Sequence, residues 1–328
     1  VIVGFRLAKR LGLSFGLLPF SNIGYSYSNT KALNSTDGST SVVKATNTYS
    51  GTGGLHQVYL GLGWSPFKGF AIGVNAAYLW GDYSRSVVNS YTDAYANTLS
   101  KYYTAEVHNY KLDFGMQYTQ KITKNDAITL GVTYGLGHKL SSDPKCQIIS
   151  TNAQTAVADT ATYSIGNGLE LPHSYGVGLM WNHANRWRVG ADYTLQKWSS
   201  VAYPKFDTST DSYELVSGQF ADRHKMTVGG EFCPDERSRS FFKRVHYRMG
   251  ASYATDYLKI KGQNGPKEYS VSAGFGIAIV NGYNNRSLLN ISAQWVRQDS
   301  KTFVTENSFR INIGLTFNER WFAKWKME

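Results

Sequence analysis

Three kinds of residue in this 328-residue sequence could carry chemistry: a serine in a G-x-S-x-G pattern, seven histidines and two cysteines. The serine is Ser14, which stands between Gly12 and Gly16. A nucleophilic serine of this pattern sits on a tight turn between a strand and a helix. Ser14 instead lies within a run of alternating apolar and polar residues, which is typical of a strand. We therefore expect no nucleophile at this position.

The histidines are scattered, and none has a second ligand at a spacing that would hold a metal ion. His108 or His138 could serve an enzyme at the rim of a barrel, but no arrangement with serine or aspartate accompanies either one. The sequence thus predicts no enzyme, no metal site and no cofactor. The full set is His56, His108, His138, His173, His183, His224 and His246.

Composition excludes several other classes of protein. No apolar run reaches 18 residues, which excludes a helical membrane protein. Aromatic residues make up 14% of the chain, which excludes disorder. The net charge of +11 comes from scattered basic residues without a recognition helix or a stacking motif, so nucleic acid is not an expected partner. Two cysteines, Cys146 and Cys233, are too few for a disulfide framework.

The elements that must position any site are strands, because apolar and polar residues alternate along most of the chain. One apolar row consists of Tyr110, Leu112, Phe114, Met116 and Tyr118, with polar residues or glycine between them. Tyrosine and tryptophan recur near the ends of such rows, as in a lipid-facing wall with aromatic girdles. The alternative, a soluble propeller, should show a blade-length repeat, and the sequence has none. The predicted fold is all-β, a transmembrane antiparallel outer-membrane β-barrel.

Thirteen strands are visible in this pattern, and they form a single barrel domain over residues 1–328. Their connections alternate between short and long, and the long ones include 30–51, 85–103, 141–161 and 202–214. Bacterial outer-membrane barrels have short periplasmic turns and long extracellular loops, which gives the expected localisation and orientation. The predicted strands are 1–8, 12–29, 52–65, 69–84, 104–121, 126–140, 162–182, 187–201, 215–232, 242–257, 268–281, 287–298 and 307–318.

The odd strand count has a consequence for the two ends of the chain. Single-chain bacterial barrels normally have an even number of strands, with both ends in the periplasm. We therefore expect about 14 strands in the mature protein, with the first strand upstream of Val1. Residues 318–328, which contain three aromatic and several basic residues, read as a short periplasmic tail that contacts lipid head groups or a partner protein.

The same topology separates the two cysteines. Cys146 falls in a predicted long loop and Cys233 at a predicted short turn. A membrane core of about 30 Å lies between those ends, whereas a disulfide requires Cα atoms within about 7 Å. We expect both thiols to be free of each other.

Nine charged residues fall on the polar side of the predicted strands. A charge against lipid costs up to about 2–4 kcal/mol at the membrane midplane, so these side chains are expected to line the lumen. They form either a network of cross-strand ion pairs or a lining that selects solutes with anionic head groups. The nine are Lys111, Asp113, Arg188, Asp192, Lys225, Glu231, Arg244, Arg248 and Arg310.

Three segments resemble the FadL/TodX-type outer-membrane hydrophobe transporters, in the divergent form found in Bacteroidota. They are LSFGLLPFSNIGY at 13–25, GTGGLHQVYLGLG followed by WSPF at 51–67, and GLTFNERWF at 314–322. The resemblance implies a 14-stranded barrel, a hatch that would precede Val1, and passage of apolar molecules. It also implies a kinked third strand that opens a lateral gap in the wall.

Pro19 falls on the strand that would be third in such a barrel. Proline cannot donate a ladder hydrogen bond and is confined to edges, strand starts or bulges. Ser21 and Asn22 follow it and interrupt the apolar row. The three residues mark either a lateral gate or a harmless bulge.

Two functions of different classes fit these features, and the resemblance favours the first of them. The first is passive uptake of a hydrophobic or amphipathic small molecule. The second is a structural role, as a plugged accessory subunit of a larger outer-membrane complex for protein secretion or barrel assembly. A pocket in the lumen favours the first, and a lumen filled by loops and ion pairs favours the second. The expected partners are membrane lipid and lipopolysaccharide, a hydrophobic ligand, and proteins of an outer-membrane complex.

Overall fold

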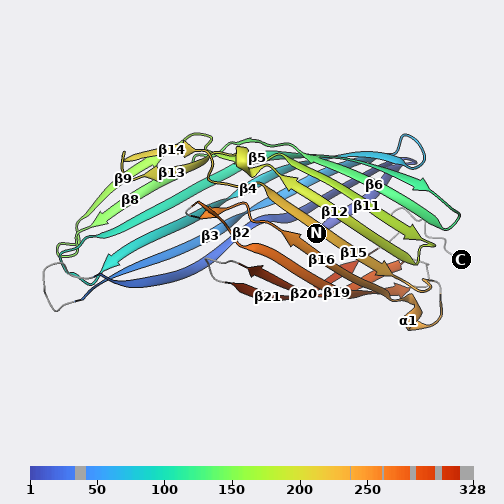
Figure 1. The fold of residues 1–328 in the computed structure, drawn as a ribbon. Helices are drawn as coiled ribbons and strands as arrows, with labels where there is room; N and C mark the ends of the chain where they lie inside the picture. The colour runs from blue at the N-terminus through green and yellow to red at the C-terminus, as the bar shows by residue number, and fades with distance from the viewer. Residues whose placement is uncertain (34–41, 237, 261, 281–285, 300–304, 318–328) are drawn as a thin grey trace, which may run out of the picture.

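The computed structural model describes residues 1–33, 42–236, 238–260, 262–280, 286–299 and 305–317. Thirteen antiparallel strands follow one another edge to edge and curl into an elongated tube (Figure 1). The predicted fold class is confirmed. In sheet order the strands are β1 (Ile2–Ala8), β2 (Leu11–Leu33), β3 (Val43–Trp64), β4 (Phe70–Tyr91), β5 (Thr98–Lys121), β6 (Asp126–Gly135), β11 (Ser174–His183), β12 (Trp187–Gln196), β15 (Arg223–Phe232), β16 (His246–Ala254), β19 (Lys267–Val280), β20 (Arg286–Asp299) and β21 (Glu306–Thr316).

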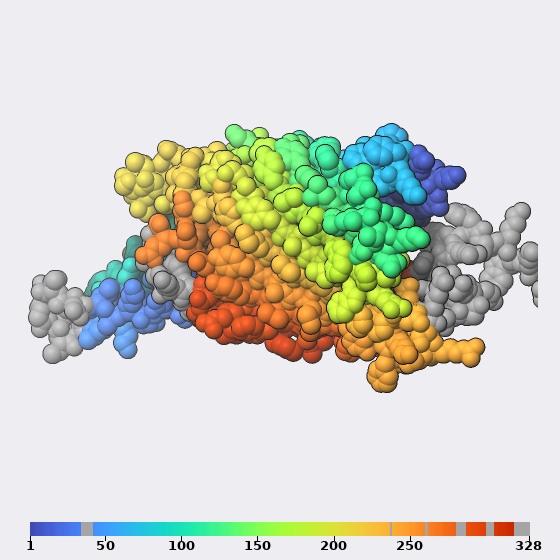
Figure 2. All heavy atoms as spheres, turned by 45° about the vertical axis from the view of Figure 1, so that its right-hand side comes forward, coloured from blue at the N-terminus to red at the C-terminus, as the bar shows by residue number. Residues whose placement is uncertain are grey.

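The two faces of this sheet differ in chemistry, because successive side chains of a strand point to opposite sides. One face, the apolar face, presents large hydrophobic side chains to the surroundings, such as Leu179 at 51% and Met249 at 73% exposed. The opposite face, the polar face, carries Lys111, Arg188 and the other strand charges. Consecutive segments run obliquely across the molecule, side by side (Figure 2). In the described residues no helix is long and apolar enough to cross a membrane.

The sheet ends at β1 on one side and at β21 on the other, and neither has a second neighbour among the described residues. Ile313 and Phe309 on the apolar face of β21 are 72% and 69% exposed, and Arg310 and Asn312 on its polar face are exposed as well. Thirteen alternating strands make β1 and β21 run in the same direction. One further strand, antiparallel to both, would join them. A fourteenth strand and an upstream hatch stay predictions.

Strands β2 to β5 are 22 to 24 residues long, whereas a strand needs only about 9–11 residues to cross a bilayer. The predicted loops 30–51 and 85–103 are therefore largely wrong. These stretches are rich in serine and threonine, whose hydroxyl groups pair across strands. Ser50 Oγ lies 2.7 Å from Ser86 Oγ, and Thr30 Oγ1 lies 3.0 Å from Thr46 Oγ1. The hairpins thus continue as a paired ladder beyond the membrane.

The connection between β6 and β11 differs most from the prediction. Strand β6 ends at Gly135, and the predicted strand 162–182 is divided among three elements. They are β9 (Ala158–Ser164), β10 (Leu169–Leu171) and the wall strand β11. Asn167 has a positive φ of 53° and Pro172 precedes β11, so the chain turns twice within this stretch. Strand β9 pairs with β8 (Lys145–Thr151), which extends the wall beside β5.

The later connections also contain short elements. A 3-10 turn (Trp198–Ser200) and the hairpin of β13 (Tyr203–Asp207) and β14 (Ser212–Val216) lie between β12 and β15. The two-residue strands β17 (Lys259–Ile260) and β18 (Gln263–Asn264) pair after β16.

The connection before β16 corrects one predicted site residue. The short helix α1 (Phe241–Arg244) precedes β16, so Arg244 is not a strand residue and leaves the set of charges on the wall. Four residues of helix turn the chain at this end, where the sequence pattern suggested a longer strand. Cys146 and Cys233 are both free, as predicted. The predicted tail 318–328 lies outside the described residues.

Candidate functional site

A small sheet covers the polar face near the long connections. Its strands are β7 (His138–Leu140) and β10, which pair antiparallel. Leu140 and Leu171 of this sheet pack against Leu79 of β4 and Val107 of β5, and all four side chains are buried. Leu79 is the cross-strand partner of Asn109. Asn109 and Lys111 lie on the same face of β5, so Leu79 lies on the polar face. The segment between β6 and β11 therefore folds back onto the polar face.

The hairpin of β13 and β14 covers the same end of the molecule (Figure 1). Phe206 is buried, with its ring 5.2 Å from that of Tyr163 and 5.0 Å from Lys101 Nζ. Strand β10 contacts β13, and β14 contacts β9. Burial raises the pKa of the Tyr213 phenol above its ordinary value. We call β7, β10, β13 and β14 the cap.

An ion pair and an aromatic cluster fix the loops that flank the cap. Lys197 Nζ lies 2.5 Å from Asp222 Oδ2. Burial by itself would raise the pKa of Asp222, but hydrogen bonds from Lys197 and Ser199 outweigh it and hold the pKa at about 2. The Trp198 ring stacks on Tyr257 with centroids 4.5 Å apart. The cap is thus anchored to the ends of β12 and β16 as well as to the wall.

The polar face further along the barrel carries the predicted strand charges. Lys111 Nζ contacts Asp113 Oδ2. Four more of them line one hollow of about 700 Å³ together with Gln117 and Thr129. Asp192, Lys225 and Arg310 form no ion pair with another described residue. The four charges in the hollow are Arg188, Asp192, Lys225 and Glu231.

Glu231 is the centre of the densest charge cluster. Its register partners on the two neighbouring strands are Arg188 and Arg248. Arg188 Nη1 donates to Oε1 at 3.1 Å, and Arg248 Nε donates to Oε2 at 2.6 Å. Arg248 Nη1 also donates to Asn290 Oδ1 at 2.6 Å, and His246 Nδ1 lies 3.2 Å from Glu231 Oε1. One carboxylate therefore holds four strands together through two guanidinium groups.

Glu231→Gln is expected to lower the free energy of unfolding by about 1–3 kcal/mol, because it leaves two guanidinium groups facing each other without their anion. The free energy of unfolding is measured by urea titration, with heat-modifiable gel mobility as the readout of the folded fraction. The control is Asp299→Asn, which breaks the more exposed pair with Arg297 at 3.0 Å and should cost less than about 1 kcal/mol. Equal losses would show that the cluster is not a structural tie.

The predicted gate residues lie where β2 changes register. Pro19 pairs with His56 and Ser21 with Leu55, so Phe20 is bulged out of the ladder. Ser21 Oγ accepts a hydrogen bond from the Leu55 amide at 3.1 Å, and the β2–β3 ladder continues on both sides of the bulge. On the other edge, pairing with β1 ends at the first residue of the chain. A bulge is present, and the lateral gate stays a hypothesis.

Ser14 lies near the start of β2, opposite Gly4 and Gly61, rather than on a turn before a helix. Six of the histidines stack or tilt against aromatic rings, as His138 does against Tyr110 with centroids 4.3 Å apart. Among the described residues, no group of three or more histidine, cysteine, aspartate or glutamate side chains could hold a metal ion.

A strongly twisted antiparallel sheet with an exposed apolar face and a polar face defines the class of outer-membrane β-barrels. The chain belongs to the BamG family, whose model matches residues 1–328. No curated protein sequence matches it.

Solved structures confirm the fold at low sequence identity. The chain is similar to the CymD monoaromatic hydrocarbon channel, with 11% identity, a TM-score of 0.60, and coverage of 97% of this chain and 90% of that one. It is also similar to the toluene transporter TbuX of Ralstonia pickettii, with 12% identity, a TM-score of 0.62, and coverage of 97% and 80%. The toluene transporter TodX of P. putida is similar as well, with 12% identity, a TM-score of 0.58, and coverage of 98% of this chain and 82% of that one. The resemblance to FadL/TodX-type barrels is confirmed for the fold, and the Bacteroidota form stays a prediction.

The sequence analysis missed the residues that carry the cap. Leu55, Leu79 and Val107 are apolar residues on the polar face at one level of three adjacent strands. Apolar residues that interrupt the polar row in this way indicate that another segment of the chain packs against the wall. The interruption can be found from the alternation of the sequence alone. The residues that pack against it, Leu140 and Leu171, cannot be found in this way.

Proposed function

We propose that this protein is a plugged outer-membrane barrel with a structural role, as an accessory subunit of a larger outer-membrane complex for protein secretion or barrel assembly. In this proposal the polar face lines the lumen, the long connections are extracellular and the short turns are periplasmic. The observation that carries it is the cap, whose buried leucines seal the polar face against β4 and β5. A barrel whose lumen is closed in this way suits a structural role better than passage of a solute.

The chemistry of the polar face supports the same role. The hollow of about 700 Å³ is lined largely by threonine, glycine and charged side chains, including Asp192 and Lys225. A pocket for an apolar solute is instead lined mainly by hydrophobic and aromatic side chains. The Glu231 cluster links β12, β15 and β16 and reaches across β19 to Asn290 of β20, which stiffens the barrel. Membership of the BamG family is compatible with the role in an assembly complex.

A second candidate is passive uptake of a hydrophobic molecule. The bulge at Phe20, next to Pro19, favours it, because a weakened ladder in β2 is where a lateral exit could form. The fold is also that of the proteins described as hydrocarbon channels and toluene transporters. In this reading the cap would have to move before a solute could enter.

Depletion of the chain in its native host separates the two functions. The structural role predicts that other outer-membrane barrels lose their folded, heat-resistant gel form, and that the tagged chain leaves mild detergent as a stoichiometric complex. Uptake predicts normal assembly of those barrels and toluene entry into liposomes that contain the purified chain alone. Isolation as a single barrel, with toluene flux and unchanged assembly, would replace the structural proposal with transport.

A further inference from the structure

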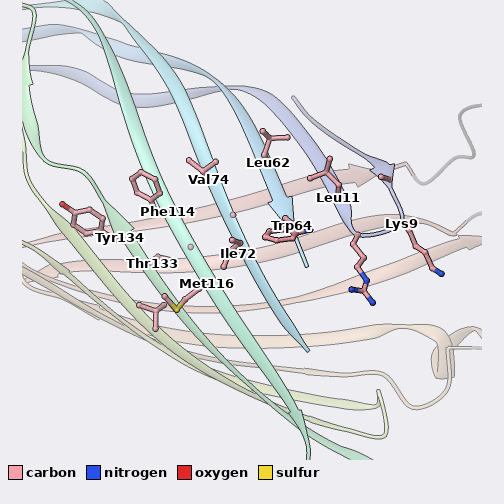
Figure 3. Close-up of a pocket in the computed structure, with 15 residues that line it drawn as sticks. Lys9, Leu11, Leu62, Trp64, Ile72, Val74, Phe114, Met116, Thr133 and Tyr134 are labelled. Atoms are coloured by element: carbon pink, nitrogen blue, oxygen red, sulfur yellow. The ribbon is translucent and has the colours of Figure 1, made fainter. Parts of the chain in front are cut away.

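The apolar face is hollowed near the end of the sheet where the short turns lie. The hollow has a volume of about 1010 Å³ and extends across six neighbouring strands, from the last residue of β1 to β6. Figure 3 shows its side chains, which come from the last residues of β3, the first residues of β4 and the parts of β5 and β6 beside them. The central ones are Leu62, Trp64, Ile72, Val74, Phe114 and Met116.

One edge of this hollow is basic. Lys9 and Arg10, in the turn between β1 and β2, belong to its lining, and Figure 3 places Lys9 beyond Leu11 at that edge. Arg10 Nη1 donates to the Pro66 carbonyl at 2.5 Å, which ties this turn to the turn between β3 and β4. Arg6 Nη2 donates to the Lys9 carbonyl at 2.6 Å. The Arg10 guanidinium group is thus held at the rim, and Arg6 fixes the backbone of the turn that carries Lys9.

The charge at this rim is not neutralised within the described part of the chain. No carboxylate there forms an ion pair with Arg6, Lys9 or Arg10. The Arg10 side chain uses one of its five N–H donors on Pro66, which leaves donors for an anion. A guanidinium group and an ammonium group side by side suit a phosphate oxygen set.

We propose that the hollow binds an anionic phospholipid, with its acyl chains against Trp64, Ile72 and Phe114 and its phosphate at Lys9 and Arg10. Bulk lipid already covers the apolar face, so an apolar surface alone would select nothing. This hollow has the size of a small-molecule pocket, and a basic turn without a carboxylate partner borders it. The combination selects a molecule that is apolar along its length and anionic at one end. Basic pockets beside membrane-spanning elements bind acidic lipid head groups by the same chemistry.

Native mass spectrometry of the detergent-solubilised full chain, titrated with phosphatidylglycerol, tests the site. The double variant Lys9→Gln with Arg10→Gln is expected to bind about 30-fold more weakly, because each basic residue near a lipid surface contributes about fivefold. The matched control is Lys121→Gln with Lys124→Gln, which removes the same charge from another short turn outside the hollow. If the double variant fails to fold, Lys9→Gln alone keeps the Arg10–Pro66 bond and should weaken binding about fivefold.

Two further arms identify the ligand. Phosphatidylethanolamine, which is zwitterionic, should bind much more weakly, and glycerol 3-phosphate should not displace the lipid. Val74→Trp, which fills the hollow without changing its charge, should reduce retention of phosphatidylglycerol. Equal binding of the two lipids, displacement by glycerol 3-phosphate, or equal losses in the double variant and its control would each overturn the proposal.

Discussion

Leu179→Arg is expected to destabilise the barrel by about 2–4 kcal/mol, because it places a charge against lipid near the middle of β11. Leu179 lies between Tyr175 and Trp181 on the apolar face and is 51% exposed to the surroundings. In lipid that exposure becomes contact with hydrocarbon, where an arginine has no water and no anion. Urea unfolding of the protein in phospholipid vesicles measures the change in the free energy of unfolding.

The next residue of the same strand provides the control. Met180 lies at the same height on the polar face and lines the hollow that contains Arg188 and Glu231. Met180→Arg should therefore cost less than about half as much as Leu179→Arg, since its charge remains beside water and an acidic group. Similar losses for the two variants would mean that the two faces of β11 have been exchanged.

Leu79→Ala is expected to detach the cap, because Leu79 is fully buried against Val107, Leu140 and Leu171. Removing a buried leucine side chain costs about 2–5 kcal/mol, depending on how far the site collapses. That loss falls on the contact between the wall and the β7–β10 sheet rather than on the ladder. We expect faster proteolysis within 141–168 and a higher conductance in planar bilayers, with a barrel that stays folded.

Leu130→Ala is the matched control for this variant. Leu130 belongs to the apolar face of β6, is 47% exposed and has no contact with the cap. It removes the same atoms from the lipid side of the wall, so proteolysis and conductance should remain at the level of the unchanged protein. An unchanged conductance in Leu79→Ala would show that the cap does not seal the barrel, and would favour the transport function.

Each prediction depends on the face assignment, and that assignment follows from local sequence. In β5, the apolar row from Tyr110 to Tyr118 and the polar row with Lys111 and Asp113 appear in the structure as predicted. A period of two residues is a property of the extended backbone itself, so neighbours in sequence are sufficient to read it. The wall strands and their order follow, because antiparallel neighbours need only a turn between them.

Where polar residues replace apolar ones in the alternating pattern, the pattern predicts strands that are shorter than those in the structure. Residues such as Thr46 and Ser86 look like loop positions, but their hydroxyl groups pair across β2, β3 and β4 outside the membrane. The structure has the predicted interruption at Pro19, since the missing donor is a local property of proline. Whether the resulting bulge opens the wall depends on a neighbour on the other edge of β2.

The sequence by itself therefore determined the class of fold, the thirteen wall strands and which side chains share a face, because these depend on contacts between adjacent residues and adjacent strands. Only the tertiary structure decided that Leu140 and Leu171 pack against Leu79 and Val107 on the polar face. It also decided that Glu231 lies between Arg188 and Arg248, and that Lys9 and Arg10 border an apolar hollow. Those contacts join segments far apart in the chain. Their geometry is set by the curvature of the whole sheet, and no local pattern encodes it.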